Sequence, residues 1–297
     1  MSILNEIKHS YRNGSVLTKL IYINLTVFLL IRLLPFVLWL FRVVEDPQQG
    51  TVLLRYVSVP SSPAELLVKP WTLFTYMFVH YDFLHVLFNM LCLFWFGRLF
   101  LDFMRPSQLL GVYIYGGLGG AIVYLLSFNL VPVFISFAPS SILLGASASA
   151  LAILFAVAAH SPNHRIYLIF IGPARLKYIA LVYLLVDLVG MTTLENTGGH
   201  LAHLGGALVG YLYVASLRKG SDWARIFESF RGGKFNFFKK RAKMTVTHKR
   251  PLTDMEYNAH KMRRQQEIDR ILEKIKRSGY DSLTSEEKKV LFEASQE

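Results

Sequence analysis

The sequence has little cysteine, few acidic residues and almost no charge over several long stretches. Its single cysteine, Cys92, excludes an intrachain disulfide and any metal site built from several thiolates. We expect Cys92 to be a small buried apolar residue. Acidic residues number 20 against 32 Lys and Arg, and the net charge of +12 lies mostly in the C-terminal third. Nothing in this composition predicts a cofactor or a metal ion.

The uncharged stretches are long and apolar. With 53% hydrophobic residues and a mean hydropathy of +0.37, the chain is too apolar for an ordinary soluble domain. Blocks of about 20 apolar residues match the hydrocarbon thickness of a bilayer. We therefore predict an all-α, multi-pass membrane protein with apolar segments at residues 20–41, 82–103, 108–128, 147–160, 175–193 and 199–217. The first run begins late and no small-residue cleavage site follows it, so no signal peptide is predicted.

Two of these segments are unusual. The first contains Arg32 and Pro35, and because a charge within a membrane helix is costly, one alternative places residues 33–41 at the outer surface. The fourth, Ser147 to His160, would be roughly 21 Å long as a helix, which is shorter than a hydrocarbon core of about 30 Å. We expect its N-terminus at the bottom of a recess lined by protein or water.

The distribution of Lys and Arg predicts the orientation. Six spans place both termini on one face, which would carry Lys8, Arg12, Lys19, Arg98, Arg105, Arg165, Arg175, Lys177, Arg218 and Lys219. The opposite face would carry Arg42, Arg55 and Lys69. The positive-inside rule makes the first face cytoplasmic, so Ser147 would face outward. Residues 42–80 contain several prolines, Pro60, Pro63 and Pro70 among them, and many apolar residues, and we expect them to dip into the interface.

The C-terminal third has a different character. Residues 218–250 contain eleven Lys and Arg and two acids, and their juxtamembrane position predicts contact with anionic lipid rather than nucleic acid. An interfacial helix is expected where four apolar residues recur at helical spacing: Trp223, Ile226, Phe227 and Phe230. From about residue 255 the pattern predicts a soluble helix with Ile268, Ile271, Leu272 and Ile275 on one face. It ends at Gly279, and Thr284 to Glu287 then forms a capping box.

A run of small residues, 145–150, carries the first candidate for chemistry. It reads Gly-Ala-Ser-Ala-Ser-Ala, and Ser147 offers a hydroxyl at the start of the short fourth segment. Taken alone, such a run is more often a surface for helix packing.

The sixth segment carries the second candidate. His203, Gly206 and Gly210 share one helix face, and the glycines allow a close approach to a neighbouring helix. If that neighbour is the Ser147 helix, imidazole and hydroxyl can form the pair that nucleophilic catalysis needs. His200, one turn earlier, is a competing base.

The second segment carries two polar side chains, His85 and Asn89, spaced four apart and so on one helix face. They and the Ser147 amide could donate hydrogen bonds to an oxyanion. An ordinary interhelical hydrogen bond is the other reading of His85 and Asn89.

Together these motifs resemble the rhomboid family of intramembrane serine proteases. The resemblance covers about residues 18–217 and rests on the Gly145 to Ser147 motif, His203 with Gly206 and Gly210, and His85 with Asn89. It implies a six-helix bundle of the bacterial type with a Ser–His dyad. In it Ser147 is the nucleophile, His203 the general base, and His85, Asn89 and the Ser147 amide form the oxyanion hole. Single-span membrane proteins would be the substrates.

The chain departs from the family pattern at two positions. Ala148 stands where the family often has Gly, and Leu151 where some members have a Tyr stacked on the histidine. Packing or some other group must then orient His203. Asp187 in the fifth segment is either a third catalytic residue or a buried polar partner of another helix. His80 and Tyr81 are expected to border the cavity.

We therefore predict a cytoplasmic N-terminus (1–17), a protease domain (18–217), a basic juxtamembrane segment (218–250) and a small helical cytoplasmic tail (251–297). The predicted location is a bacterial cytoplasmic membrane. The rival hypotheses are an inactive rhomboid-like protein that binds clients, and a transporter or channel. The second would more naturally show repeated halves, which this sequence lacks.

Overall fold

The protein is described from a computed structural model that covers residues 3–43, 50–168, 172–193, 196–231 and 254–294. The chain divides into two compact units, Met1–Asn236 and Phe237–Glu297. The division falls inside the segment that we predicted as basic and juxtamembrane, much of which lies outside the described residues.

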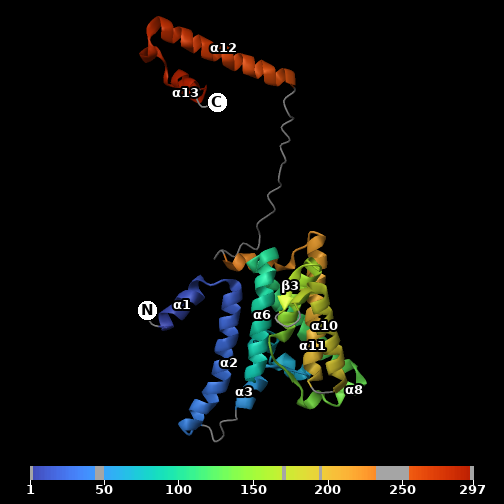
Figure 1. Cartoon of the computed structure of the whole chain (residues 1–297). Coiled ribbons are helices and arrows are strands. Elements are labelled where there is room, and N and C mark those ends of the chain that lie inside the picture. The colour runs from blue at the N-terminus through green and yellow to red at the C-terminus, as the bar shows by residue number, and fades with distance from the viewer. Residues whose placement is uncertain (1–2, 44–49, 169–171, 194–195, 232–253, 295–297) are drawn as a thin grey trace. The chain divides into compact units, whose positions relative to one another are not determined.

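Within the described residues, five helices are long and apolar enough to cross a membrane. They are α2 (Val16–Leu40), α6 (Phe83–Phe103), α7 (Pro106–Leu130), α10 (Leu176–Gly190) extended by η4 (Met191–Thr193), and α11 (Thr197–Arg218). Figure 1 shows α2, α6, α10 and α11 as long rods that run in one general direction. A sixth apolar helix, α9 (Ser147–His160), is shorter, and it has the bounds that the sequence predicted.

The first long helix, α2, is not interrupted near residue 33, where one sequence-based alternative ended the span. α2 continues through Pro35 to Leu40 as one helix, and the position of residues 33–41 relative to the membrane surface stays a prediction. A proline is tolerated in such a helix because neighbouring groups can compensate for the lost hydrogen bond. The guanidinium of Arg32 lies 4.7 Å from the centre of the Tyr81 ring, a cation–π contact that gives this charge a partner.

The core is built from α7, α9 and α11, which approach one another through small residues. A Cβ added at Gly206 or Gly210 of α11 would lie 2.1 Å from the backbone oxygen of Ala148 or Ala152 on α9. A Cβ at Gly116 of α7 would lie 2.2 Å from the Ala152 Cβ. Such close backbone contact is the usual way in which membrane helices associate without a hydrophobic driving force. The short helix α9 is therefore enclosed by protein.

The connection between α2 and α6 is largely helical. It contains α3 (Gly50–Val57), β1 (Val59–Pro60), α4 (Pro63–Val68), α5 (Thr72–Thr75) and η2 (Tyr76–Phe78). β1 pairs antiparallel with β2 (Ile142–Leu143), with Val59 opposite Leu143. This pairing ties the connection to the loop that leads into α9. Leu67 and Val68 of α4 are strongly exposed, as an interfacial segment would require.

The remaining short elements of the first unit lie before, between or after the long helices in the chain. They are α1 (Ile3–Asn13), α8 (Pro132–Ile135), η3 (Ala138–Ser140), β3 (Arg165–Leu168), β4 (Gly172–Arg175) and η5 (Trp223–Arg231). β3 and β4 form an antiparallel hairpin in which Arg165 pairs with Arg175.

The segment after α11 docks on the bundle more closely than the sequence predicted. η5 forms where we expected an interfacial helix, but a Cβ at Gly111 of α7 would lie 2.4 Å from the Ala224 Cβ, so one side of η5 is buried. Asp222 accepts hydrogen bonds from Arg105 at 2.5 Å and from Tyr213 at 2.8 Å. Trp223 and Ile226 remain exposed, as lipid contact would need.

The second unit is a helical hairpin made of α12 (Asp254–Ser278), η6 (Tyr280–Ser282) and α13 (Ser285–Ala294). Gly279 ends α12 with a φ of +77°, and Thr284 and Glu287 exchange the two hydrogen bonds of a capping box, as predicted. On the helix face that Ile268, Ile271, Leu272 and Ile275 share, Ile271 is buried, whereas Leu272 is 48% exposed.

Candidate active site

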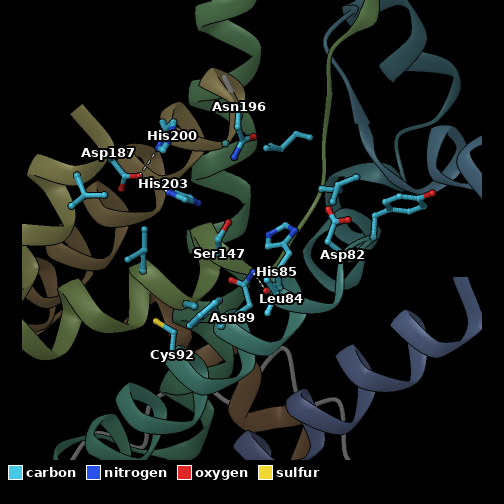
Figure 2. A pocket seen from close by; sticks show the side chains of 18 of the residues that line it. Asp82, Leu84, His85, Asn89, Cys92, Ser147, Asp187, Asn196, His200 and His203 are labelled. Carbon is cyan, nitrogen blue, oxygen red and sulfur yellow. Dashed lines mark hydrogen bonds and ion pairs between the residues drawn. The ribbon is translucent and has the colours of Figure 1, made fainter. Parts of the chain in front are cut away.

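A pocket of about 890 Å³ brings together the residues that the sequence singled out. Ser147, His203, His85 and Asn89 all line it, and they come from α9, α11 and α6. Figure 2 shows the Ser147 hydroxyl and the His203 ring facing each other across this space, with His85 and Asn89 beside them. The lining also includes Tyr81 and Asp187, which the sequence analysis named as possible participants.

Ser147 is the first residue of α9, and its position depends on the turn before it. Gly145 has a φ of +118°, a conformation that L side chains rarely adopt. A Cβ at Gly145 would also lie 2.9 Å from ring atoms of His85. Glycine is therefore needed here for two reasons, and the turn brings the start of α9 against the histidine of α6.

His80 binds the backbone of this turn through a hydrogen bond. Its side chain is fully buried, and its Nε2 accepts a hydrogen bond from the Ala146 amide at 3.3 Å. Burial, with His85 nearby, lowers the pKa of His80 to about 3, so the ring is neutral and able to accept. The sequence predicted that His80 borders the cavity, but it lies behind the backbone and Tyr81 is the one that lines the space.

His85 and Asn89 lie one helical turn apart in α6 and both line the pocket. The Asn89 side-chain amide donates a hydrogen bond to the His85 carbonyl at 2.9 Å, which holds it against its own helix. The His85 ring stacks edge-on against His80, with ring centres 5.1 Å apart. Both polar groups therefore face the space beside Ser147 from a fixed helix.

His203 reaches the pocket because α11 is pressed against α9. Its ring nitrogen Nδ1 lies 2.7 Å from Oδ1 of Asp187 on α10. Asp187, for which the sequence left open a catalytic role or a polar contact to another helix, thus lies against the His203 ring, where it can hold the ring's orientation. His200 Nδ1 lies 2.8 Å from the same oxygen, so Asp187 is shared by two imidazoles. Figure 2 shows His203 between Asp187 and Ser147, with His200 farther from the serine.

The serine and the histidine are not hydrogen-bonded to each other in this structure. Among the described residues, the Ser147 hydroxyl has no hydrogen-bond partner. A long or poorly aligned contact is common between catalytic groups before a substrate is bound. The arrangement contains a free hydroxyl, a carboxylate-bound imidazole and nearby donors, which together can perform acyl transfer.

The same pocket contains a group that could hold a metal ion. The ligand atoms of Asp187, His200 and His203 all lie within 4.8 Å of one another. The sequence analysis predicted no metal ion; its single cysteine excluded only a site of several thiolates, and the pattern gave no sign that these three residues meet. Two histidines three apart, which share one helix face, were the available signal.

Fold and pocket define a class: a multi-pass membrane protein with a pocket that combines a serine, a histidine and a carboxylate. A family model described as the Rhomboid domain matches residues 68–220, which is about half of the chain and includes every residue of the pocket from Tyr81 to His203. The chain therefore belongs to the rhomboid family.

Two curated relatives agree with this assignment. RHOMBOID-like protein 12, mitochondrial, of Arabidopsis thaliana is 30% identical over 157 residues, which cover 50% of this chain and 47% of the relative. Presenilin-associated rhomboid-like protein, mitochondrial, of Bos taurus is 31% identical over 187 residues, which cover 60% of this chain and 45% of the relative. The matched region thus spans about half the length of each relative. Residues 253–297 match a separate family of unknown function, DUF6576.

Proposed function

We propose that this protein is an intramembrane serine endopeptidase that cleaves transmembrane segments of single-span membrane proteins. The observation that carries the proposal is the meeting of Ser147, His203, His85 and Asn89 in one pocket. These four residues come from three helices, and each has the chemical group that its proposed role requires. Membership of the rhomboid family supports the same activity.

The proposed reaction begins with Ser147. Its Oγ attacks the scissile carbonyl carbon while Nε2 of His203 accepts the hydroxyl proton. The tetrahedral intermediate collapses as His203 returns that proton to the leaving amine. Water then hydrolyses the acyl-enzyme by the same route, with His203 again acting as base.

The negative charge on the carbonyl oxygen is the second requirement. His85, the Asn89 amide and the backbone amide of Ser147 would donate to it, and removal of one such donor typically costs 10²–10³-fold in kcat. The Ser147 amide stands at the N-terminus of α9, where backbone donors have no helical partner.

Asp187 acts in this proposal as a positioning residue. The hydrogen bond from His203 Nδ1–H to Asp187 would leave the lone pair of Nε2 directed at Ser147. The dyad of the sequence prediction thus becomes a serine, a histidine and an orienting aspartate.

The proposed topology has six spans, with the 14-residue α9 as the short one. Both termini would be cytoplasmic and Ser147 would face the outer leaflet. A transmembrane substrate must first unwind, because its peptide bonds are protected by helical hydrogen bonds. We therefore expect cleavage near small or helix-breaking residues. A bacterial cytoplasmic membrane is our proposed location; the names of both relatives raise a mitochondrial membrane as the alternative.

Purified protein with a model single-span substrate tests the activity. Ser147→Ala should abolish cleavage, and wild type should react with a fluorophosphonate at Ser147. His203→Ala should abolish both signals, whereas His200→Ala, the matched control three residues away, should retain them. Full cleavage by Ser147→Ala would refute the proposal. Absent labelling and cleavage in a folded wild-type protein would favour a client-binding rhomboid without activity.

The tail is proposed to lie against anionic lipid through its basic segment and to take no direct part in catalysis. Deletion of residues 232–297 should leave cleavage of the model substrate unchanged. The deletion spares η5, because that segment is docked on α7.

A further inference from the structure

The pocket contains a cluster of three polar side chains, Asp187, His200 and His203. The proposed cleavage reaction gives a role to two of them but not to His200. Oδ1 of Asp187 lies 2.8 Å from His200 Nδ1 and 2.7 Å from His203 Nδ1. The side chains of both histidines are 19% exposed and that of Asp187 is 8% exposed. The orientation of His203 needs Asp187 alone, so His200 has no task in the proposed reaction.

Two imidazoles and one carboxylate are a typical donor set for zinc and similar divalent transition ions. Around a tetrahedral Zn²⁺ such donor atoms lie about 3.0–3.4 Å apart, given metal–ligand distances near 2.0–2.1 Å. The Asp187 oxygen would therefore have to move away from the two nitrogens by about half an ångström. The remaining coordination position would face the pocket, which has room for water or a substrate oxygen.

His200 is held in place for this arrangement by Gly190 at the end of α10. A Cβ at Gly190 would lie 2.5 Å from Cε1 and Nε2 of His200, so the ring is wedged against the backbone there. With Nε2 against Gly190, Nδ1 is the nitrogen that remains directed at Asp187. The third ligand is thus positioned by backbone contact before any ion arrives.

We propose that Asp187, His200 and His203 bind one divalent transition ion of the zinc type, and that the bound ion switches proteolysis off. The inhibitory part rests on the proposed function, whereas the binding part does not. It also departs from the sequence prediction that the protein has no metal site.

The inhibition follows from the tautomer of His203. Without the ion, the neutral ring carries its proton on Nδ1, donates it to Asp187 and keeps a lone pair on Nε2 for the Ser147 proton. An ion on Nδ1 requires the lone pair there, so the proton moves to Nε2 and the ring can no longer act as base. The neutral ring keeps one proton in both states, and no other species is consumed.

Metal binding is measured first. The sample is full-length protein in detergent; it carries no histidine tag and has been treated with a chelator to remove bound metal. Titration calorimetry with Zn²⁺, and the visible absorption of Co²⁺ as a spectroscopic substitute, should show one site in both wild type and the inactive Ser147→Ala variant. His200→Ala should weaken binding at least about 100-fold, because even loss of an outer partner of a ligand costs 10–100-fold. His160→Ala, which removes an exposed histidine outside the pocket, is the matched control and should bind as wild type does.

Cleavage is measured second. Zn²⁺ in excess of its measured Kd should abolish cleavage by wild type and by His160→Ala, and a chelator should restore it. His200→Ala should cleave at a rate close to that of metal-free wild type and should resist the same Zn²⁺ concentration.

The outcomes separate the two proposals. Absence of binding, or equal binding by His200→Ala and wild type, overturns the metal site. Binding to wild type that leaves cleavage intact overturns the inhibition. Binding that depends on His200 in a protein without any cleavage supports the metal site and counts against the proposed protease function alone.

Discussion

The helices that hold the serine and the histidine are packed very differently from the helix that holds the aspartate. In α9, 10 of 14 residues are buried, and α11 meets it backbone to backbone at Gly206 and Gly210. In α10 only Leu176, Ile179, Ala180 and Asp187 are buried, and most of its remaining apolar side chains are exposed. The proposed nucleophile and the proposed base thus lie on either side of one close contact between α9 and α11, which we call the seam. The carboxylate proposed to orient the base stands on a helix with few buried residues.

This difference bears on regulation as well as on chemistry. Packed cores respond to change in discrete steps, while elements with few buried contacts open at a low free-energy cost. Movement of α10 would withdraw Asp187 from His203 without disturbing the contact between α9 and α11. If the protein is the proposed protease, the seam should decide whether cleavage occurs at all, and the position of α10 should decide how well the His203 ring is aligned. The predictions below test this division.

The largest effect should follow from breaking the seam. Gly206→Leu places a side chain where even a Cβ would lie 2.1 Å from the Ala148 oxygen, so α11 must move away from α9. We expect cleavage and fluorophosphonate labelling to be lost and the melting temperature to fall, because overpacking typically costs about 1–3 kcal/mol or more. Leu208→Ala, at a position of α11 that is 53% exposed, is the control and should remain active. Normal labelling of Gly206→Leu would contradict the role of the seam.

The turn before Ser147 should be the next most sensitive position. Gly145→Ala should have two unfavourable effects. Alanine would be strained at a φ of +118°, and its Cβ would lie only 2.9 Å from atoms of the His85 ring. We expect kcat to fall about 10²-fold or more, since loss of a single oxyanion donor has that effect. Gly172→Ala matches the strain of a positive φ (+82°) but meets no atom within 4 Å, so it should leave kcat unchanged. Similar losses in both variants would show that strain alone explains the result.

Asp187→Asn tests the role of α10, the helix with few buried residues. The variant keeps the size of the side chain but can offer His203 an N–H donor, which favours the wrong tautomer of the ring. We expect kcat to fall on the order of 10²-fold, within the range of general-base effects, while KM and the melting temperature change little. A large fall in melting temperature would instead make Asp187 a structural partner between α10 and α11. Unchanged kcat would show that His203 is oriented without it.

The smallest effect on activity should come from a substitution in the second unit, Phe237–Glu297. Hydrogen bonds from Lys274 and from the Thr284 amide lower the pKa of Glu287 from 4.5 to about 2. Its contribution to hairpin stability is therefore complete above pH 4.5 and is lost as the pH falls towards 2. A carbon-13 NMR titration of the Glu287 carboxyl in the full-length protein should show this low value, and Lys274→Met should raise it. Cleavage by Lys274→Met should equal that of wild type.

Several features could be predicted because they depend on local pattern. The lengths of the apolar runs predicted the long helices to within a few residues, and the break after His160 predicted the short one. Spacing on a helix face placed Gly206 and Gly210 together with His203. The turn at Gly279 and the capping box at Thr284 were also predicted correctly, since each depends on a few neighbouring residues.

Other features depend on how helices are rotated against one another. Periodicity is weak in α10 and α11 because both faces of a membrane helix are apolar, so the side of α10 that carries Asp187 could not be assigned. The structure turns that side towards His203 and His200. The same holds for His80, which reaches the Ala146 amide from another part of the chain, and for η5, which docks on α7 through Ala224.

The sequence alone determined that this chain is an apolar, multi-helix membrane protein with a serine at the start of a short helix and a histidine on a glycine-lined face. Helix length, turns and small-residue spacing are local properties, and they are written in consecutive residues. Only the tertiary structure decided that an aspartate on a third helix joins two histidines beside that serine. The contact between these side chains depends on how each helix is rotated and how far it is shifted along its axis. Close packing between helices sets both, and no local sequence pattern does.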